Sequence, residues 1–158
     1  MKKIKILIPV YNDWQSVFKL LENINSKVST IDCEFSVIII NDASTESRPE
    51  LLADLRNLKS GENINMKENR GHARCIAAGL KHINETKDFD YVIPMDGDGQ
   101  DKPEELSLLI EKIRDYPEAV VTADRVKRPE GFTFKFCYST HKLLTFIFTG
   151  QTIKYGNY

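Results

Sequence analysis

Apolar, β-branched runs of strand length alternate along this chain with segments whose apolar residues recur at helical spacing. The runs that predict buried strands are Ile4–Val10, Phe35–Ile40, Asn63–Lys67, Tyr91–Met95 and Ala119–Ala123. The segments that predict helices are Trp14–Ile24, Ser47–Leu58 with a capping box at its start, Gly71–Ile83, and a further one from Asp101 to Ile113. Alternating strands and helices form βαβ units. The pattern therefore predicts the α/β class, with a Rossmann-like, mostly parallel sheet and helices on both faces.

Polar side chains follow each predicted strand at the point where it ends. The carboxyl ends of parallel strands share one edge of the sheet, and ligands of α/β proteins bind outside that edge. Five polar sets at one edge favour a ligand site over chance surface turns. The sets are Tyr11 to Asp13, Asn41 with Asp42, Asn69 to Gly71, Asp96 with Asp98, and Asp124 and Arg125 with Lys127 and Arg128.

The fourth set, Asp96-Gly97-Asp98, is typical of a site for a hard divalent cation. Oxygen ligands suit Mg²⁺ or Mn²⁺, which usually shares its shell with substrate phosphates. Taken alone, the motif is also typical of an acidic surface turn, because Asp and Gly are common turn residues. An EF-hand is excluded, since its sixth and twelfth positions should be Gly and Glu but are Asp101 and Ser107.

The polar sets favour recognition of a nucleotide diphosphate. A metal offsets the diphosphate charge, and Arg70 or Arg125 can clamp phosphate oxygens in bidentate fashion. Backbone N–H groups at the helix start after Gly71 add donors for an anion, and Asp42 is expected to be free to accept hydrogen bonds from a base or ribose. A dinucleotide or P-loop site is not predicted, because the chain lacks both glycine motifs. His72 also lies at this edge, where it can contact a phosphate, but a lone histidine is more often a solvated or capped residue.

Bulk properties narrow the function classes. The 158 residues fit one domain, and 41% apolar and 28% charged residues are ordinary for a globular protein. A net charge of -1 argues against nucleic-acid binding. The cysteines, an odd number without metal-ligand spacing, predict free thiols in a reducing compartment. No signal peptide or membrane-spanning run is recognised, so the expected location is the cytoplasm, including the inner face of the membrane.

The motifs, taken in order, resemble glycosyltransferase family 2 over about residues 4 to 128. Pro9 to Asp13 is similar to the family's opening Pro-x-Tyr-Asn-Glu, with Asp for the usual Glu. The segment from Asp96 to Glu104 is similar to the Asp-Ala-Asp-Leu-Gln-x-x-Pro-Glu of the dolichyl- and polyprenyl-phosphate sugar transferases. The other matches are Asn41 to Ser44 with Asp-Asp-Gly-Ser, Asn69 to Gly71 plus Ala73 and Ala77 with Asn-x-Gly-x-x-x-Ala, and Arg125 with Gly-Ser-Arg.

The resemblance implies the GT-A type of fold and a role for each matching residue. Asp96, Asp98 and Gln100 would ligate Mg²⁺ or Mn²⁺. The residues implied to bind the donor are Pro9, Tyr11 and Asp13 in the nucleoside pocket, Asp42 at the base or ribose, Arg70 near the donor and Arg125 at the diphosphate. Asn41 and Ala43 also depart from the family pattern, which puts fine base specificity in doubt.

Two domains are expected: a nucleotide-sugar-binding α/β domain over residues 1–128, and an aromatic C-terminal segment over 129–158. That segment is interpreted either as a helix packed on the sheet or on a missing half, or as an interfacial helix beside a membrane. Because the family is normally longer, a truncated or minimal donor-binding chain is expected, with an acceptor region starting near Tyr158.

The function expected from these observations is an inverting, metal-dependent glycosyltransferase that uses a nucleotide-diphosphate sugar. The acceptor would be a polyprenyl phosphate or a glycan, and no catalytic base can be identified. Two alternatives stay open, a donor-binding module without turnover and a nucleotidyltransferase acting on a sugar phosphate. The sequence does not indicate the base, the sugar or the oligomeric state.

Overall fold

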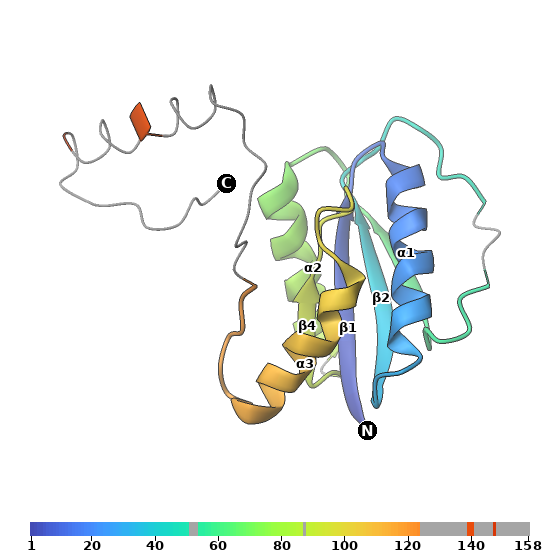
Figure 1. Ribbon diagram of the computed structural model, residues 1–158. Coiled ribbons are helices and arrows are strands. Elements are labelled where there is room, and N and C mark those ends of the chain that lie inside the picture. The colour runs from blue at the N-terminus through green and yellow to red at the C-terminus, as the bar shows by residue number, and fades with distance from the viewer. Residues whose placement is uncertain (51–53, 87, 124–138, 141–146, 148–158) are drawn as a thin grey trace. The chain divides into compact units, whose positions relative to one another are not determined.

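The computed structural model describes residues 1–50, 54–86, 88–123, 139–140 and 147 (Figure 1). The chain divides into two compact units, residues 1–121 and residues 122–158. The expected domain boundary at residue 128 stays a prediction. In the second unit the described residues 139, 140 and 147 are helical. Among the described residues, no helix has the length and apolar character needed to cross a membrane.

The first unit contains a four-stranded sheet whose paired strands are all parallel, in the order β3-β2-β1-β4. The strands are β1 (Lys2–Val10), β2 (Cys33–Asn41), β3 (Gly61–Asn65) and β4 (Tyr91–Pro94). β1, β2 and β3 end in register, because Val10 pairs with Asn41 and Asn41 pairs with Asn65. All strands run toward the edge that is uppermost in Figure 1, so the loops that follow them meet there.

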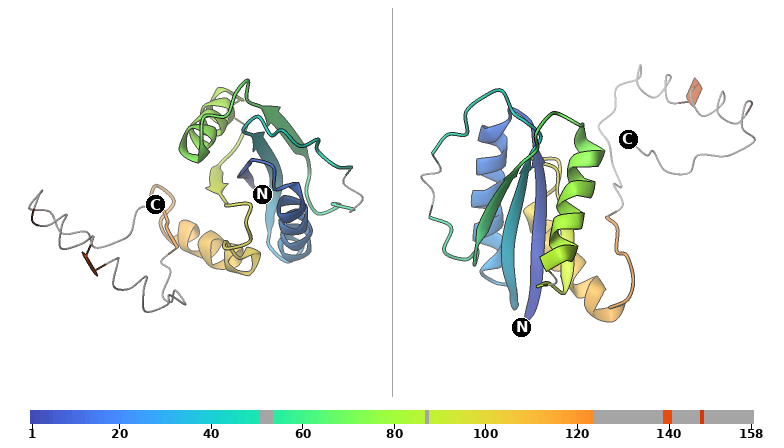
Figure 2. Two further views of the ribbon diagram at one scale, coloured as in Figure 1. Left: turned by 90° about the horizontal axis from the view of Figure 1, so that it is seen from above. Right: turned by 180° about the vertical axis from the view of Figure 1, so that it is seen from behind.

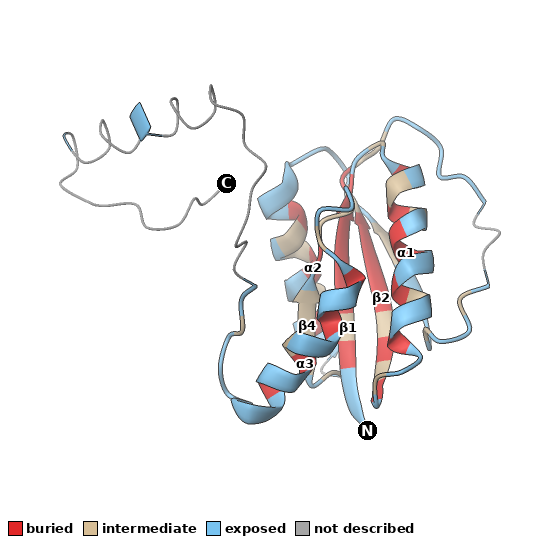
Figure 3. Cartoon of the chain, viewed as in Figure 1, coloured by how far each residue is buried: buried red, intermediate tan, exposed pale blue. Residues whose placement is uncertain are grey.

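Helices cover both faces of this sheet, which confirms the predicted α/β fold. The helices are α1 (Trp14–Val28), α2 (His72–Thr86) and α3 (Leu106–Asp115), the last preceded by the short 3-10 helix η1 (Pro103–Glu105). Viewed from above, α2 lies on one face, while α1 and α3 lie on the other (Figure 2). β1 and β2 are therefore buried from both sides, which explains their nearly continuous apolar sequences (Figure 3).

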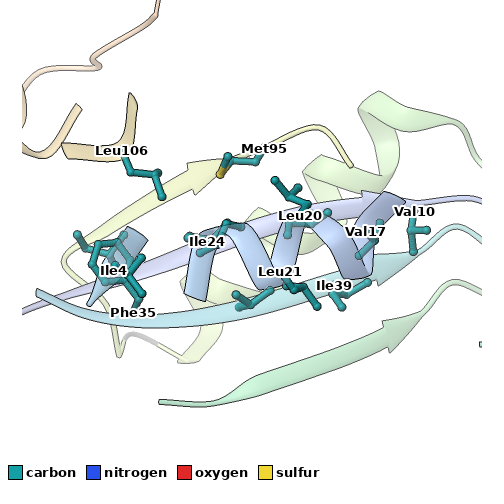
Figure 4. Close-up of a cluster of buried hydrophobic side chains, with 14 of the residues drawn as sticks. Ile4, Val10, Val17, Leu20, Leu21, Ile24, Phe35, Ile39, Met95 and Leu106 are labelled. Carbon is teal, nitrogen blue, oxygen red and sulfur yellow. The ribbon is translucent and has the colours of Figure 1, made fainter. Parts of the chain in front are cut away.

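The larger core lies between the sheet and the α1 and α3 helices (Figure 4). Alternate residues of β1 face it, beginning with Ile4, whereas Leu7 points to the smaller core under α2. A glycine lets α2 approach the sheet closely, because a Cβ atom at Gly79 would lie 2.4 Å from Leu7 Cδ1. The apolar spacing of each helix thus fits the face it covers.

The helix predicted over residues 47–58 is wrong, since the described residues 47–50 and 54–58 form none. Leu55 and Leu58 instead pack from an irregular segment against the larger core. Asn57 ties that segment to α1, because its backbone N donates to Asn25 Oδ1 at 2.9 Å and its side chain donates to Asn25 O at 2.9 Å. Leu55 and Leu58 are packed against the larger core without being part of a helix. Their helical spacing therefore gave a wrong prediction.

The strand predicted over residues 119–123 is also wrong, because these described residues form no strand. The Val120 side chain is 91% exposed. A β-prone run becomes a strand only where a neighbouring strand supplies hydrogen bonds and cover. The third strand also differs from its prediction, since it starts at Gly61 rather than at Asn63.

Candidate functional site

Hydrogen bonds of Asn12 connect the loop that follows β1 to the loop that follows β2. Its Oδ1 accepts hydrogen bonds from the backbone N of Thr45 at 2.8 Å and of Glu46 at 3.1 Å. Its own backbone N donates to Ser44 Oγ at 2.9 Å. Asn12 has a φ of 60°, in the left-handed region that asparagine tolerates better than most residues. This part of the sheet edge is therefore shaped before any ligand arrives.

The end of β2 uses an asparagine where the family pattern has an aspartate. Asn41 Oδ1 accepts the backbone N–H of Ser44 at 2.9 Å, and Asn41 Nδ2 donates to Asn65 Oδ1 at 2.9 Å. An aspartate could make the first hydrogen bond but not the second, because a carboxylate has no N–H. The next departure, Ala43, has a φ of 57°, which explains why the family pattern has glycine there.

Asp42 is the only buried charged or polar residue in the part of the chain that the structure describes, with 4% of its surface exposed. Its Oδ1 accepts the backbone N–H of Arg70 at 2.9 Å, and its Oδ2 accepts that of Gly71 at 2.8 Å. Gly71 has a φ of +82°, so the chain can turn there into α2. The carboxylate thus fixes the start of α2, where it also faces the positive end of the helix dipole.

This geometry differs from the expectation that Asp42 is free to receive a base or ribose. Each carboxylate oxygen already accepts a backbone N–H, although a carboxylate has about four acceptor positions in all. The role of Asp42 toward a nucleoside stays a prediction. Its structural role could have been suspected from sequence, because an acidic residue at this edge is placed to satisfy the unpaired N–H groups of a helix start.

The loop after β4 is held mainly by its own residues. The backbone N of Asp96 donates to Asp101 Oδ2 at 2.7 Å. Asp98 Oδ1 accepts the backbone N–H of Gln100 at 2.9 Å, and Asp98 Oδ2 accepts its side-chain Nε2 at 2.8 Å. Asp98 is exposed and Asp96 is half-buried. The loop therefore presents two carboxylates at the sheet edge.

Gly97 and Gly99 in this loop suit their positions for different geometric reasons. A Cβ atom at Gly97 would lie 2.8 Å from Val17 Cγ2 and 3.4 Å from Pro9 O, so a side chain at this position would require Val17 to shift. Gly99 has a φ of +80°, a conformation that L side chains rarely adopt. The backbone between the two aspartates therefore passes close to the end of β1 and the start of α1.

The carboxylates of Asp96 and Asp98 fit a hard cation that is held together with a diphosphate. Mg²⁺ is usually bound by one or two carboxylates plus substrate phosphates, not by a closed protein cage. Within the described residues, no group of three or more His, Cys, Asp or Glu side chains is arranged to hold a metal. Gln100 directs its Nε2 to Asp98, so its role as an oxygen ligand stays a prediction.

The remaining predicted site residues are placed as follows. Pro9 is buried within β1, and Tyr11 is 48% exposed just beyond it. Asp13 caps α1, because its Oδ1 accepts the backbone N–H of Ser16 at 3.3 Å. Arg70 is exposed and forms an ion pair with Glu68. Arg125 lies outside the described residues. The binding roles of all of these stay predictions.

One contact that sequence reasoning missed joins α2 to the loop after β4. The imidazole Nε2 of His72 lies 3.3 Å from Asp96 Oδ1, and the two side chains are 58% and 43% exposed. His72 is the first residue of α2, directly after the backbone that Asp42 holds. A lone histidine in sequence gave no sign of this partner, because His72 begins α2 and Asp96 lies in the loop after β4, 24 residues later.

A buried thiol near Asp42 is not a nucleophile. Cys75 is fully buried, and its Sγ donates to Ile40 O at 3.3 Å. Burial, with a further contribution from the Asp42 carboxylate, raises the pKa of the Cys75 thiol to about 11. The thiol therefore stays protonated near neutral pH, and a thiol rather than a thiolate is a poor nucleophile.

A small cavity of about 110 Å³ lies away from these residues. It is mainly apolar, and none of its lining residues is one of the predicted site residues. The lining includes Leu21, Val37, Ile39, Arg48, Leu55 and Leu58. The candidate site is therefore the carboxyl edge of the sheet, where the loops meet, and not this cavity.

A family model described as Glycosyl transferase family 2 matches residues 5–157. Among curated proteins, an undecaprenyl-phosphate 4-deoxy-4-formamido-L-arabinose transferase from Klebsiella pneumoniae (strain 342) is 27% identical over 134 residues. The match covers 84% of this chain and 40% of that protein, so the chain spans about two fifths of this relative.

Two solved structures show the fold. The mannosyltransferase PcManGT from Pyrobaculum calidifontis, in complex with GDP-Man and Mn²⁺, matches with a TM-score of 0.62 and 22% identity, over 84% of this chain and 38% of that one. S. aureus TarS in complex with UDP matches with a TM-score of 0.57 and 19% identity, over 84% and 39%. With the family match, these similarities confirm the expected GT-A type of fold.

Proposed function

Because the chain belongs to glycosyl transferase family 2, we propose that it forms the donor-binding part of a metal-dependent transferase. The reaction moves a sugar from a nucleotide-diphosphate sugar to an acceptor. The observation that supports this most directly is the pair of carboxylates, Asp96 and Asp98, at the carboxyl edge of a parallel sheet. Asp96 lies beside the first residue of α2, where Asp42 accepts hydrogen bonds from the backbone.

Each part of this edge has a defined task in the proposal. Asp96 and Asp98 hold Mg²⁺ or Mn²⁺, which when bound offsets the charge of the diphosphate leaving group. Arg70 lies near the donor and Arg125 contacts the diphosphate. Pro9, Tyr11 and Asp13 line the nucleoside pocket, with Asp42 toward the base or ribose. Supporting this, a structural neighbour was solved with GDP-Man and Mn²⁺, and another with UDP.

For the acceptor we propose a polyprenyl phosphate. The support is the curated relative, whose name specifies undecaprenyl phosphate. A phosphate is already ionised near neutral pH, so it can attack the anomeric carbon without a general base and invert its configuration. The reaction would then take place at the cytoplasmic surface of a membrane, with peripheral contact through residues 129–158. A glycan hydroxyl, the other acceptor class, would require a base that we cannot assign.

The second candidate is a donor-binding module without turnover. It is supported by the candidate site, where residues suited to a metal and a diphosphate are present and no catalytic base is assigned. Both candidates predict nucleotide binding, and only product formation separates them. Nucleotidyl transfer to a sugar phosphate is less well supported, because such sites place a glycine-rich, basic loop after the first strand. This chain has Tyr11-Asn12-Asp13 there, with Asn12 committed to the neighbouring loop.

The test is calorimetric titration of UDP, GDP, ADP and CDP with Mn²⁺ and with EDTA, followed by a transfer assay with polyprenyl phosphate. We expect one of these diphosphates to bind in Mn²⁺ and to lose at least tenfold in affinity in EDTA. Asp115→Asn, at the far end of α3, is the matched control and should bind like the parent. Full affinity in EDTA would overturn the metal assignment, and no binding of any diphosphate would overturn the proposed function.

A further inference from the structure

We propose that His72 is a positioning residue for Asp96, through which the start of α2 orients the metal-binding carboxylate. This inference rests on the proposed function, because it concerns the same cation site. From sequence, His72 was expected to be a solvated or capped residue, with no role toward Asp96. The observation behind it is the 3.3 Å separation between His72 Nε2 and Asp96 Oδ1.

Each of the two residues has its backbone fixed by other parts of the structure. His72 follows Gly71, whose N–H is held by the buried Asp42 at 2.8 Å. Asp96 follows Met95, whose N donates to Leu7 O at 2.9 Å, and its own N donates to Asp101 Oδ2 at 2.7 Å. The contact between the side chains thus joins two anchored segments, and it is not an encounter of two mobile loops.

The two carboxylates of the cation site differ in this respect. Asp98 is hydrogen-bonded to Gln100, two residues away in the same loop. Asp96 faces a side chain from α2, 24 residues earlier in the chain. A carboxylate that ligates a metal is usually oriented by a hydrogen bond from an outer partner, and removing such partners typically weakens metal binding about 10–100-fold. His72 is placed to be that partner for Asp96.

His82 provides a matched control on the same helix. Its Nε2 lies 3.0 Å from Glu62 Oε1, so it also pairs an imidazole with a carboxylate, but Glu62 belongs to β3 and not to the loop after β4. Replacing His82 tests what the loss of an imidazole does to α2 in general. Only replacement of His72 should change the cation site.

The experiment measures Mn²⁺ binding to the full chain by electron paramagnetic resonance, alone and with UDP or GDP. We expect His72→Ala to weaken Mn²⁺ binding about tenfold or more, His72→Gln to recover most of it through its own N–H donor, and His82→Ala to bind like the parent. Thermal unfolding of each variant separates loss of folding from loss of binding. Nitrogen NMR of His72 should also change in Asp96→Asn, a readout that needs no metal.

A double-mutant cycle tests whether His72 acts through Asp96. In the Asp96→Asn background, His72→Ala should cause no further loss of Mn²⁺ binding. An equal loss in both backgrounds would show that His72 acts on the cation or diphosphate independently, and would overturn the inference. Unchanged Mn²⁺ binding in His72→Ala would overturn it while leaving the proposed function intact. If the parent protein does not bind Mn²⁺ under any of these conditions, the proposed function fails and the inference fails with it.

Discussion

Two loops at the carboxyl edge of the sheet carry acidic residues, and the structure treats them differently. After β2, Asp42 is 4% exposed and accepts two backbone N–H groups from the segment that starts α2. After β4, Asp98 is exposed and is hydrogen-bonded to Gln100 in its own loop. In sequence the two aspartates look alike, since each follows an apolar run. From these environments we expect the first mainly to hold the fold and the second to meet a ligand.

The difference between the two aspartates lies in the hydrogen-bond donors that would lose an acceptor if each carboxylate were removed. Without Asp42, the backbone N–H groups of Arg70 and Gly71 would lose their part-buried hydrogen bonds to its carboxylate, although Gly71 N also donates to Asn69 Oδ1 at 3.2 Å. Losing hydrogen bonds to a charged acceptor is costly. Without Asp98, the exposed donors of Gln100 can turn to water. The comparison therefore predicts that stability and binding respond to different aspartates.

The largest expected effect tests the first half of that comparison. Asp42→Ala should lower the free energy of unfolding by about 2–4 kcal/mol, because two part-buried hydrogen bonds to a charged acceptor are lost. Urea unfolding measures this directly. Asp42→Asn keeps one acceptor oxygen and should lose less stability, while weakening nucleoside and nucleotide binding alike. An unchanged unfolding midpoint in Asp42→Ala would break the comparison.

The second prediction concerns the exposed carboxylate. Asp98→Ala should weaken Mn²⁺-dependent binding of a nucleotide diphosphate at least tenfold, which corresponds to about 1.4 kcal/mol. Its free energy of unfolding should stay within about 0.5 kcal/mol of the parent, as for most surface substitutions. Calorimetry and urea unfolding on the same sample give both values. A large loss of stability with normal binding would show that the two loops do not divide their tasks as proposed.

The third prediction sharpens the account of the loop after β2. Ala43→Gly should raise the free energy of unfolding by up to about 1 kcal/mol, because alanine at a φ of 57° is strained and glycine is not. Gly99→Ala offers the reverse test in the loop after β4, where φ is +80° and added strain should destabilise. Urea unfolding of both variants checks the sign. A destabilising Ala43→Gly would show that the strain is absorbed elsewhere.

The smallest effect lies at the amino ends of the strands, far from the candidate site. Asp90 accepts from Lys2 Nζ and from the backbone N of Lys3, both at 2.7 Å, and these contacts lower the pKa of the Asp90 carboxyl below its usual 3.8. A lowered pKa in the folded state stabilises the protein above that usual value. The contribution is lost as the pH falls through the folded pKa.

Urea unfolding across pH therefore checks the Asp90 contacts. Asp90→Asn should be slightly less stable than the parent near neutral pH, and the gap should close as the pH falls below about 3.8. Binding of a nucleotide diphosphate should not change, because these contacts lie at the opposite end of the strands from Asp42 and Asp98. A stability gap that widens in acid would contradict the assignment.

Some helices and strands could be predicted from the sequence and others could not. β1 and β2 were predicted because strands covered on both faces carry almost unbroken apolar runs, and α1 and α2 because helices covering a sheet repeat apolar residues at a fixed spacing. The helix at residues 47–58 and the strand at 119–123 failed for one reason. Whether Leu55 or Val120 joins a regular element depends on which distant segment covers it, and local spacing does not contain that information.

The amino-acid sequence was enough to predict the α/β class, the sheet edge at which the polar residues after the first four strands lie, and the motif order typical of the family. Those features follow from local periodicity and from the rule that parallel strands end at one edge. Only the tertiary structure decided that Asp42 is buried against the start of α2 and that His72 faces Asp96. Such partners are far apart in the chain and meet only because packing of the helices on the sheet brings their loops together.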